Sequence, residues 1–202
     1  MKSLTLFVLC LLTVQSFAQI ETTDTIVAKY DAQIAQAEAD EMEEIIPHIS
    51  TTCPLILPAI GLVNHQIDIY FDQFREESEI EGEGIQTAST IRKVSFQIVS
   101  GSYQFDYTFH FDLAGNLIFH SERAEDPDYS CTLTSYYFDK QVKCIQLRSE
   151  LLATEFCELP AENLPEIRTE LSDIEKFTVK WIIKSASQYK ELLAVYMDIM
   201  LN

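Results

Sequence analysis

Two histidines and two carboxylates lie close together in the sequence, at a spacing that suits a metal ion. His110 and Asp112 come just before residues 113–115, and His120 and Glu122 follow them. If residues 113–115 form a turn between antiparallel strands, diagonal neighbours across the pair are ~7–8 Å apart. His110 and His120 could then share one ion, with Asp112 or Glu122 completing its ligand shell. The alternative is four ordinary solvated strand residues, because spacing alone does not define a site.

Other signatures of chemistry are absent from the sequence. It contains no Gly-x-Ser-x-Gly elbow, phosphate-binding loop, His-Glu-x-x-His motif or EF-hand loop. Gly82 and Gly84 lie among glutamates that would repel a phosphate. We therefore predict no cofactor, and we favour a non-catalytic protein over an enzyme.

The first 18 residues predict a cleavable secretory signal peptide. Lys2 provides a positive start, an apolar run extends from Leu4 to Val14, and Ser16-Phe17-Ala18 supplies small residues for cleavage before Gln19. The run is too short for a permanent membrane span. Cys10 lies inside the run and not after the cleavage point, which argues against a lipid anchor. We expect a secreted or periplasmic protein without a membrane anchor in the mature chain; the alternative is a buried N-terminal helix of a cytosolic protein.

Cysteine usage fits an oxidising compartment. Four of the five cysteines remain after cleavage, Cys53, Cys131, Cys144 and Cys157, and four cysteines allow three connectivities. In a hairpin formed by residues 131–150, Cys131 and Cys144 would lie about five positions apart, which at ~3.3 Å per residue is beyond disulfide reach. Two connectivities remain. Because residue 157 follows closely after the end of the returning strand, we predict the pairs Cys131 with Cys157 and Cys53 with Cys144.

Acidic residues dominate the charge of the chain. It carries 32 Asp and Glu against 14 Lys and Arg, a formal net charge of −18. Such a field repels nucleic acid and anionic lipid and favours a cationic protein or peptide. The alternative is that the charge serves solubility alone.

Alternating apolar residues between Val94 and Glu150 predict antiparallel strands. They recur at every second position on both sides of turns near Gly101 and Gly115, and a second hairpin turns near Lys140. One face of this sheet is aromatic, with Tyr103, Phe105, Tyr107, Phe109 and Phe111, while His110 and His120 belong to the polar face.

Helical spacing predicts a helix at each end of the mature chain. One covers residues 24–46, and one long or two consecutive helices cover residues 166–200, with Pro165 at the start. Residues 47–66 contain three prolines and are expected to be irregular. The fold class is therefore α+β in a single domain of residues 19–202: an antiparallel meander of about five to six strands, packed on one face by the N-terminal and C-terminal helical segments.

These observations favour an exported acidic binding protein whose partner is a cationic protein or peptide. The first alternative is a carrier of a small apolar ligand in a cavity under the aromatic face of the sheet. The second alternative is an enzyme whose site the sequence does not reveal.

Overall fold

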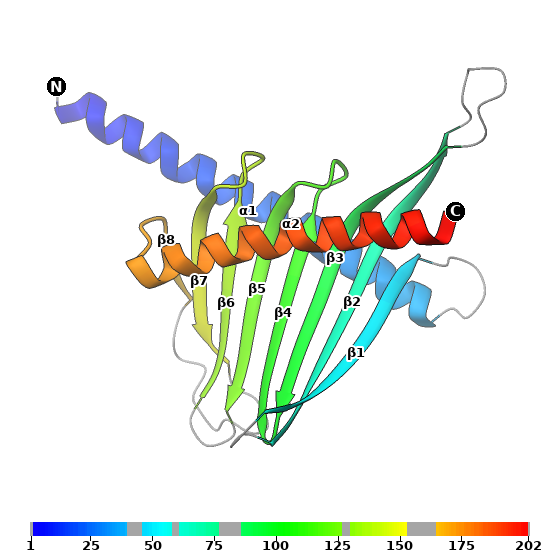
Figure 1. The fold of residues 1–202 in the computed structure, drawn as a ribbon. Helices are drawn as coiled ribbons and strands as arrows, with labels where there is room; N and C mark the ends of the chain where they lie inside the picture. Colours follow the sequence, from blue (N-terminus) through cyan, green and yellow to red (C-terminus); the bar gives the residue numbers. More distant parts are fainter. Residues whose placement is uncertain are drawn as a thin grey trace.

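The protein is a single antiparallel sheet with a long helix on each face (Figure 1). The computed structural model describes residues 2–39, 46–57, 61–76, 86–126, 130–152 and 165–201, with side chains on the first helix from Ile20 onward. The strands pair in chain order: β1 (His48–Leu57), β2 (Gly61–Glu76), β3 (Gln86–Ser100), β4 (Tyr103–Phe111), β5 (Leu117–Asp126), β6 (Ser130–Phe138), β7 (Cys144–Leu151) and β8 (Glu166–Arg168). The α+β class and the antiparallel meander are confirmed, although the predicted five to six strands are too few.

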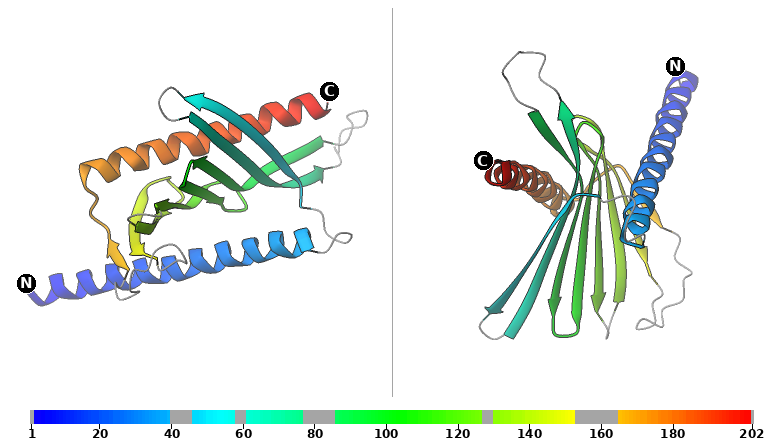
Figure 2. Two further views of the ribbon diagram at one scale, coloured as in Figure 1. Left: turned by 90° about the horizontal axis from the view of Figure 1, so that it is seen from below. Right: turned by 90° about the vertical axis from the view of Figure 1, so that its right-hand side faces the viewer.

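The two helices cover opposite faces of the sheet, contrary to the prediction that both pack on one. Figure 2 shows α1 (Lys2–Ala39) on one side and α2 (Asp173–Leu201) on the other. The reason is that the sheet has two buried faces. The α2 face holds the main core, including Val94, Phe109 and Leu147, whereas the α1 face holds a smaller cluster with Ile20, Phe119 and Tyr137.

The expected cleavage point between Ala18 and Gln19 lies inside the continuous helix α1. The first turns of this helix extend beyond the edge of the sheet formed by β7 and β8 (Figures 1 and 2). From Ile20 the side chains that contact the sheet recur at helical spacing. Among the described residues, no helix combines the length and the apolar content that crossing a membrane requires.

Residues 48–57 form a strand, so the prediction of an irregular segment over residues 47–66 is wrong. The prolines rule out a helix in this segment, but they do not rule out an edge strand. Pro54 lies on β1, which is the edge of the sheet, where a missing N–H removes no ladder hydrogen bond.

The hairpin of β4 and β5 contains an irregularity that sequence alternation does not reveal. His110 pairs with Phe119 and Phe111 pairs with Leu117, so Ile118 is an extra residue without a partner on β4. One extra residue reverses which side chains of a strand face each side of the sheet. Phe119 therefore faces α1, while His120 turns toward the aromatic α2 face.

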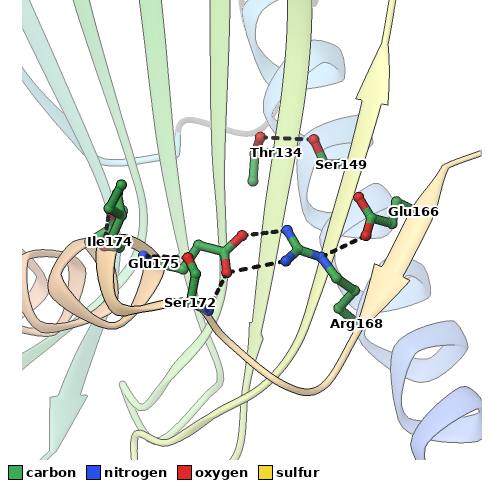
Figure 3. Close-up of polar contacts among 8 residues, drawn as sticks. Thr134, Ser149, Glu166, Arg168, Ser172, Ile174 and Glu175 are labelled. Atoms are coloured by element: carbon green, nitrogen blue, oxygen red, sulfur yellow. Dashed lines mark hydrogen bonds and ion pairs between the residues drawn. The ribbon is translucent and has the colours of Figure 1, made fainter.

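Helix α2 begins later than predicted, because residues 166–168 form the edge strand β8. Ser172 caps the helix: its backbone N–H donates to Glu175 at 2.6 Å, and the Glu175 N–H donates to Ser172 Oγ at 3.3 Å. Arg168 of β8 also binds the Glu175 carboxylate (Figure 3). This reciprocal cap, and not Pro165, fixes the start of α2.

The predicted pair Cys53 with Cys144 is wrong, since both cysteines are free. They lie on β1 and β7, and six strand spacings of ~4.8 Å put them far beyond disulfide reach. Cys131 is fully buried and disulfide-bonded. Cys157 lies outside the described residues, so its pairing with Cys131 stays a prediction.

Candidate functional site

The four residues expected to bind a metal do not form a site. The extra residue Ile118 places His110 and His120 on opposite faces of the sheet, so they cannot share an ion. Asp112 is used by the turn, where its Oδ1 accepts hydrogen bonds from the backbone N–H groups of Ala114 and Asn116 at 2.9 and 2.8 Å. Among the described residues, no group of three potential ligands could hold a metal ion.

Each buried histidine instead pairs with a partly exposed carboxylate on its own face of the sheet. His110 Nε2 lies 3.0 Å from Asp31 Oδ1 on α1, and His120 Nε2 lies 3.2 Å from Glu122 Oε1. Burial lowers the pKa of both histidines, and the carboxylates offset this only in part. Both imidazoles are therefore neutral donors at neutral pH and serve packing of the sheet.

Helix α1 is held on the sheet by three carboxylates at seven-residue spacing. Asp24 accepts from the Tyr137 hydroxyl at 2.9 Å, Asp31 accepts from Lys93 Nζ at 2.7 Å, and Glu38 accepts from the Tyr70 hydroxyl at 3.1 Å. Seven residues are about two helical turns, so these carboxylates share one face of α1. We call Asp24, Asp31 and Glu38 the docking carboxylates. They fix the position of α1 over a partly polar sheet face.

A groove of about 820 Å³ lies between α1 and the turns that follow β4 and β6. This volume is in the range of sites for small molecules. The α1 side chains on its wall include Ile26, Lys29 and Tyr30. The opposite side is formed by side chains from the sheet and its turns: Asp72, Arg92, Asp112, Leu113, Ala114, Ile118, Phe138 and Lys140.

A buried hydrogen-bond donor, the Tyr30 hydroxyl, marks the groove as a place for a polar group. Tyr30 is only 6% exposed, and its hydroxyl has no hydrogen-bond partner in the part of the chain that the structure describes. A buried hydroxyl without a partner is costly, and ligands commonly satisfy such groups. Burial is the main cause that raises the pKa of Tyr30 well above its ordinary value, so the hydroxyl keeps its proton.

Arg92 lies directly beside this tyrosine. Its guanidinium carbon is 4.7 Å from the centroid of the Tyr30 ring, and its Nη1 binds Asp72 at 2.6 Å. Its Nε also contacts the Phe111 carbonyl at 3.4 Å. The hydrogen bonds that Arg92 donates come from Nε and Nη1, which leaves Nη2 for a further acceptor, whereas the Tyr30 hydroxyl is buried without a partner among the described residues.

The groove differs in charge from the rest of the molecule. Its walls carry three cations, Lys29, Arg92 and Lys140, and two carboxylates, Asp72 and Asp112. Asp112 stays ionised, since its hydrogen bonds within the turn hold its pKa below the ordinary value, and Asp72 pairs with Arg92. Three positive and two negative side chains give the walls a formal charge of +1, in a chain of net charge −18.

Sequence reasoning missed this groove. The sequence places Tyr30 in the predicted helix of residues 24–46 and Arg92 just before the predicted strands, and no motif links the two. Tyr30 and Arg92 meet because α1 packs across the sheet. The neighbouring residues Asp31 and Lys93 also pair there, although 62 positions separate them in the sequence. Helix α2 packs on part of the aromatic row that was expected to line a cavity: Phe109 is fully buried with Trp181 and Tyr189 against it, whereas Tyr103 is 42% exposed.

Comparisons with known proteins do not assign the chain to a family. No protein family model, curated protein or solved structure matches the chain.

Proposed function

We propose that the protein is an exported, non-catalytic binding protein that takes an amphiphilic ligand with a small anionic group in the groove beside α1. One observation carries the proposal: Tyr30 lines the groove, its hydroxyl is buried without a partner in the described part of the chain, and the Arg92 guanidinium lies over its ring. A carboxylate or a similar acceptor would satisfy both donors.

The remaining surface of the groove suits the apolar part of such a ligand. Ile26 is 39% exposed and Leu113 is 73% exposed on its rim, and Ile118 and Phe138 lie deeper. Covering exposed apolar area contributes roughly 25 cal/mol per Å². Affinity should therefore come from the apolar chain, and selectivity from the head group.

A head-group series tests this proposal. Decanoate, decanol and decyltrimethylammonium share an apolar chain and differ in charge, and calorimetry would compare their affinities for the purified mature protein. We expect decanoate to bind about ten-fold more tightly than decanol, because a hydrogen bond to a charged group contributes about 1.5–3 kcal/mol. Equal affinity for decanoate and decyltrimethylammonium, or no binding of any of the three, would refute the proposal.

Matched variants locate the ligand. Tyr30→Phe removes only the hydroxyl and should weaken decanoate binding by about five-fold without weakening decanol, since one hydrogen bond contributes ~1 kcal/mol. Tyr196→Phe is the control, because Tyr196 is partly exposed on α2, outside the groove. Leu113→Ser should weaken both ligands, whereas Leu62→Ser, which changes a 55% exposed leucine on β2, should weaken neither.

A second candidate function is binding of a cationic protein or peptide. The net charge of −18 supports it, because a field of this size accelerates encounter with a basic partner. Binding of an oligo-lysine peptide should weaken steeply as salt rises, whereas decanoate binding should change little. Absence of peptide binding at low salt would exclude this candidate.

A further inference from the structure

Helix α2 carries a second apolar stripe besides the one that packs on the sheet. Its packed side includes Val179, Ile182 and Leu193, which are at most 9% exposed. At 3.6 residues per turn, the second stripe is rotated from these residues by about 130°. Its large side chains are exposed: Ile174 80%, Phe177 74%, Trp181 37%, Leu192 46%, Val195 57% and Ile199 70%. An exposed apolar row of this length indicates an interaction surface.

The spacing along this stripe is the same in both directions from its middle. Its positions follow one another at steps of 4, 3, 4, 4, 3 and 4 residues, and we call them the seam: Phe177, Trp181, Lys184, Gln188, Leu192, Val195 and Ile199. Steps of three and four residues are typical of helices that pack side by side. A twofold axis at Gln188 would therefore set an antiparallel second α2 with each seam position opposite another: Phe177 opposite Ile199, Trp181 opposite Val195, and Lys184 opposite Leu192.

Charge also favours a second copy of α2 over other partners. The exposed Lys184 lies four residues before Gln188, and the exposed Glu191 lies three residues after it. In the antiparallel pair, Lys184 of each copy therefore lies beside Glu191 of the other. The helix as a whole is neutral in a chain of net charge −18, because four lysines balance four acidic residues: Lys176, Lys180, Lys184 and Lys190 against Asp173, Glu175, Glu191 and Asp198. This face therefore repels a second copy less than the acidic remainder of the chain does.

We propose that the protein forms a twofold-symmetric dimer through the seam of α2, with the two helices antiparallel. Figure 2 shows α2 on the side of the sheet opposite α1, so this contact leaves the groove beside α1 free. The dimer is independent of the ligand proposed for that groove. One helix pair is smaller than a standard protein interface, so we expect a dissociation constant on the order of 10 µM.

Sedimentation equilibrium of the mature protein from about 5 to 500 µM measures this dimer. The salt concentration should be about 0.15 M, where the Debye length is about 8 Å, so that distant charges are screened while contacting side chains still interact. Trp181 is the only tryptophan and lies in the seam. Its emission should therefore move to shorter wavelength over the same range of concentration.

Two variants of adjacent residues locate the contact. Val195→Glu places a charge in the seam and should weaken dimerisation by at least about ten-fold, because burying an unpaired charge is costly. Ala194→Glu is the control: it adds the same charge one position earlier, about 100° around the helix and outside the seam, and should weaken dimerisation by less than about two-fold. Both residues are exposed in the single chain, so both variants should keep the fold, which circular dichroism checks.

A charge exchange tests the antiparallel arrangement. Lys184→Glu should weaken dimerisation by about five- to ten-fold, because it sets like charges side by side at two symmetric places. Adding Glu191→Lys should restore dimerisation. Adding Glu21→Lys instead is the control, because Glu21 is exposed on α1; it restores the net charge but not the contact, and should leave the dimer weak.

Three results would overturn the proposal. The first is a monomer over the whole range of concentration. The second is a dimer that leaves the emission of Trp181 unchanged, or that Val195→Glu and Ala194→Glu weaken equally, since either result would place the contact elsewhere on the molecule. The third is equal restoration of the Lys184→Glu variant by Glu191→Lys and Glu21→Lys, which would show that net charge alone controls association.

Discussion

Helix α1 forms one wall of the proposed groove, so the docking carboxylates that hold it are the first place to perturb. Asp31 is the central one: its Oδ1 lies 2.7 Å from Lys93 Nζ and 3.0 Å from His110 Nε2. The Asp31 side chain is 41% exposed, while Lys93 and His110 are 16% and 4% exposed. Asp31→Asn keeps the shape and one acceptor oxygen but removes the charge.

The expected loss follows from these exposures. Hydrogen bonds to a charged group contribute about 1.5–3 kcal/mol when buried, and exposure of Asp31 reduces this toward the ~1 kcal/mol of surface pairs. We expect the free energy of unfolding to fall by about 1–3 kcal/mol, a Tm decrease of roughly 2–10 °C for a domain of this length. Glu191→Gln, the control, changes an exposed residue of α2 and should change Tm by less than about 2 °C.

The pH dependence of the stability that Asp31 contributes follows from the direction in which its pKa is shifted. Burial raises the pKa of Asp31, but His110 and Lys93 outweigh it, and the pKa lies below its ordinary value. The ionised carboxylate therefore stabilises the fold above the pKa of the unfolded chain, about 3.9, and this stabilisation is lost as pH falls through the folded pKa. The Tm difference between wild type and Asp31→Asn, followed by circular dichroism, should be full at neutral pH and shrink in acid. Equal Tm values at neutral pH, or a difference that persists unchanged once Asp31 is protonated, would refute the reasoning.

Two further predictions concern α2 and the free thiols. Ser172→Ala removes the hydroxyl that accepts from the Glu175 N–H at the start of α2, and it should lower the free energy of unfolding by ~1 kcal/mol. Ser187→Ala is the control, because Ser187 is exposed within α2 and the change should leave the free energy of unfolding unaltered. Equal Tm values for the two variants would contradict the capping role. In the native protein the exposed Cys53 should react quickly with a thiol reagent at mildly alkaline pH. Cys144 should react only on unfolding, because burial raises its pKa to about 11. Peptide mapping that finds both cysteines labelled at the same rate would contradict this.

The strands were predictable where side chains alternate without interruption. Residues from Val94 to Phe109 alternate between a core face and a partly polar face, and the structure pairs them as two antiparallel strands. The alternation fails at Ile118, because an extra residue reverses the faces of β5 without leaving a mark on composition. That single position made the metal hypothesis wrong.

The placement of the helices was not predictable from their apolar stripes. An apolar stripe indicates that a helix packs against another part of the protein, but it does not indicate which face of a sheet the helix covers. The α1 face is held partly by Asp24, Asp31 and Glu38, which look like ordinary solvated residues in the sequence. The groove follows from this placement, so neither Tyr30 nor Arg92 could be assigned a role beforehand.

The residues of the sheet that bind α1 are synthesised long after α1 itself. Asp24 binds Tyr137 and Arg148, which lie 113 and 124 positions further along. If the chain is exported N-terminus first, as we propose, α1 has no sheet to dock on until β7 has emerged. A peptidase that cuts after Ala18 would then meet an undocked helix, before the groove has closed.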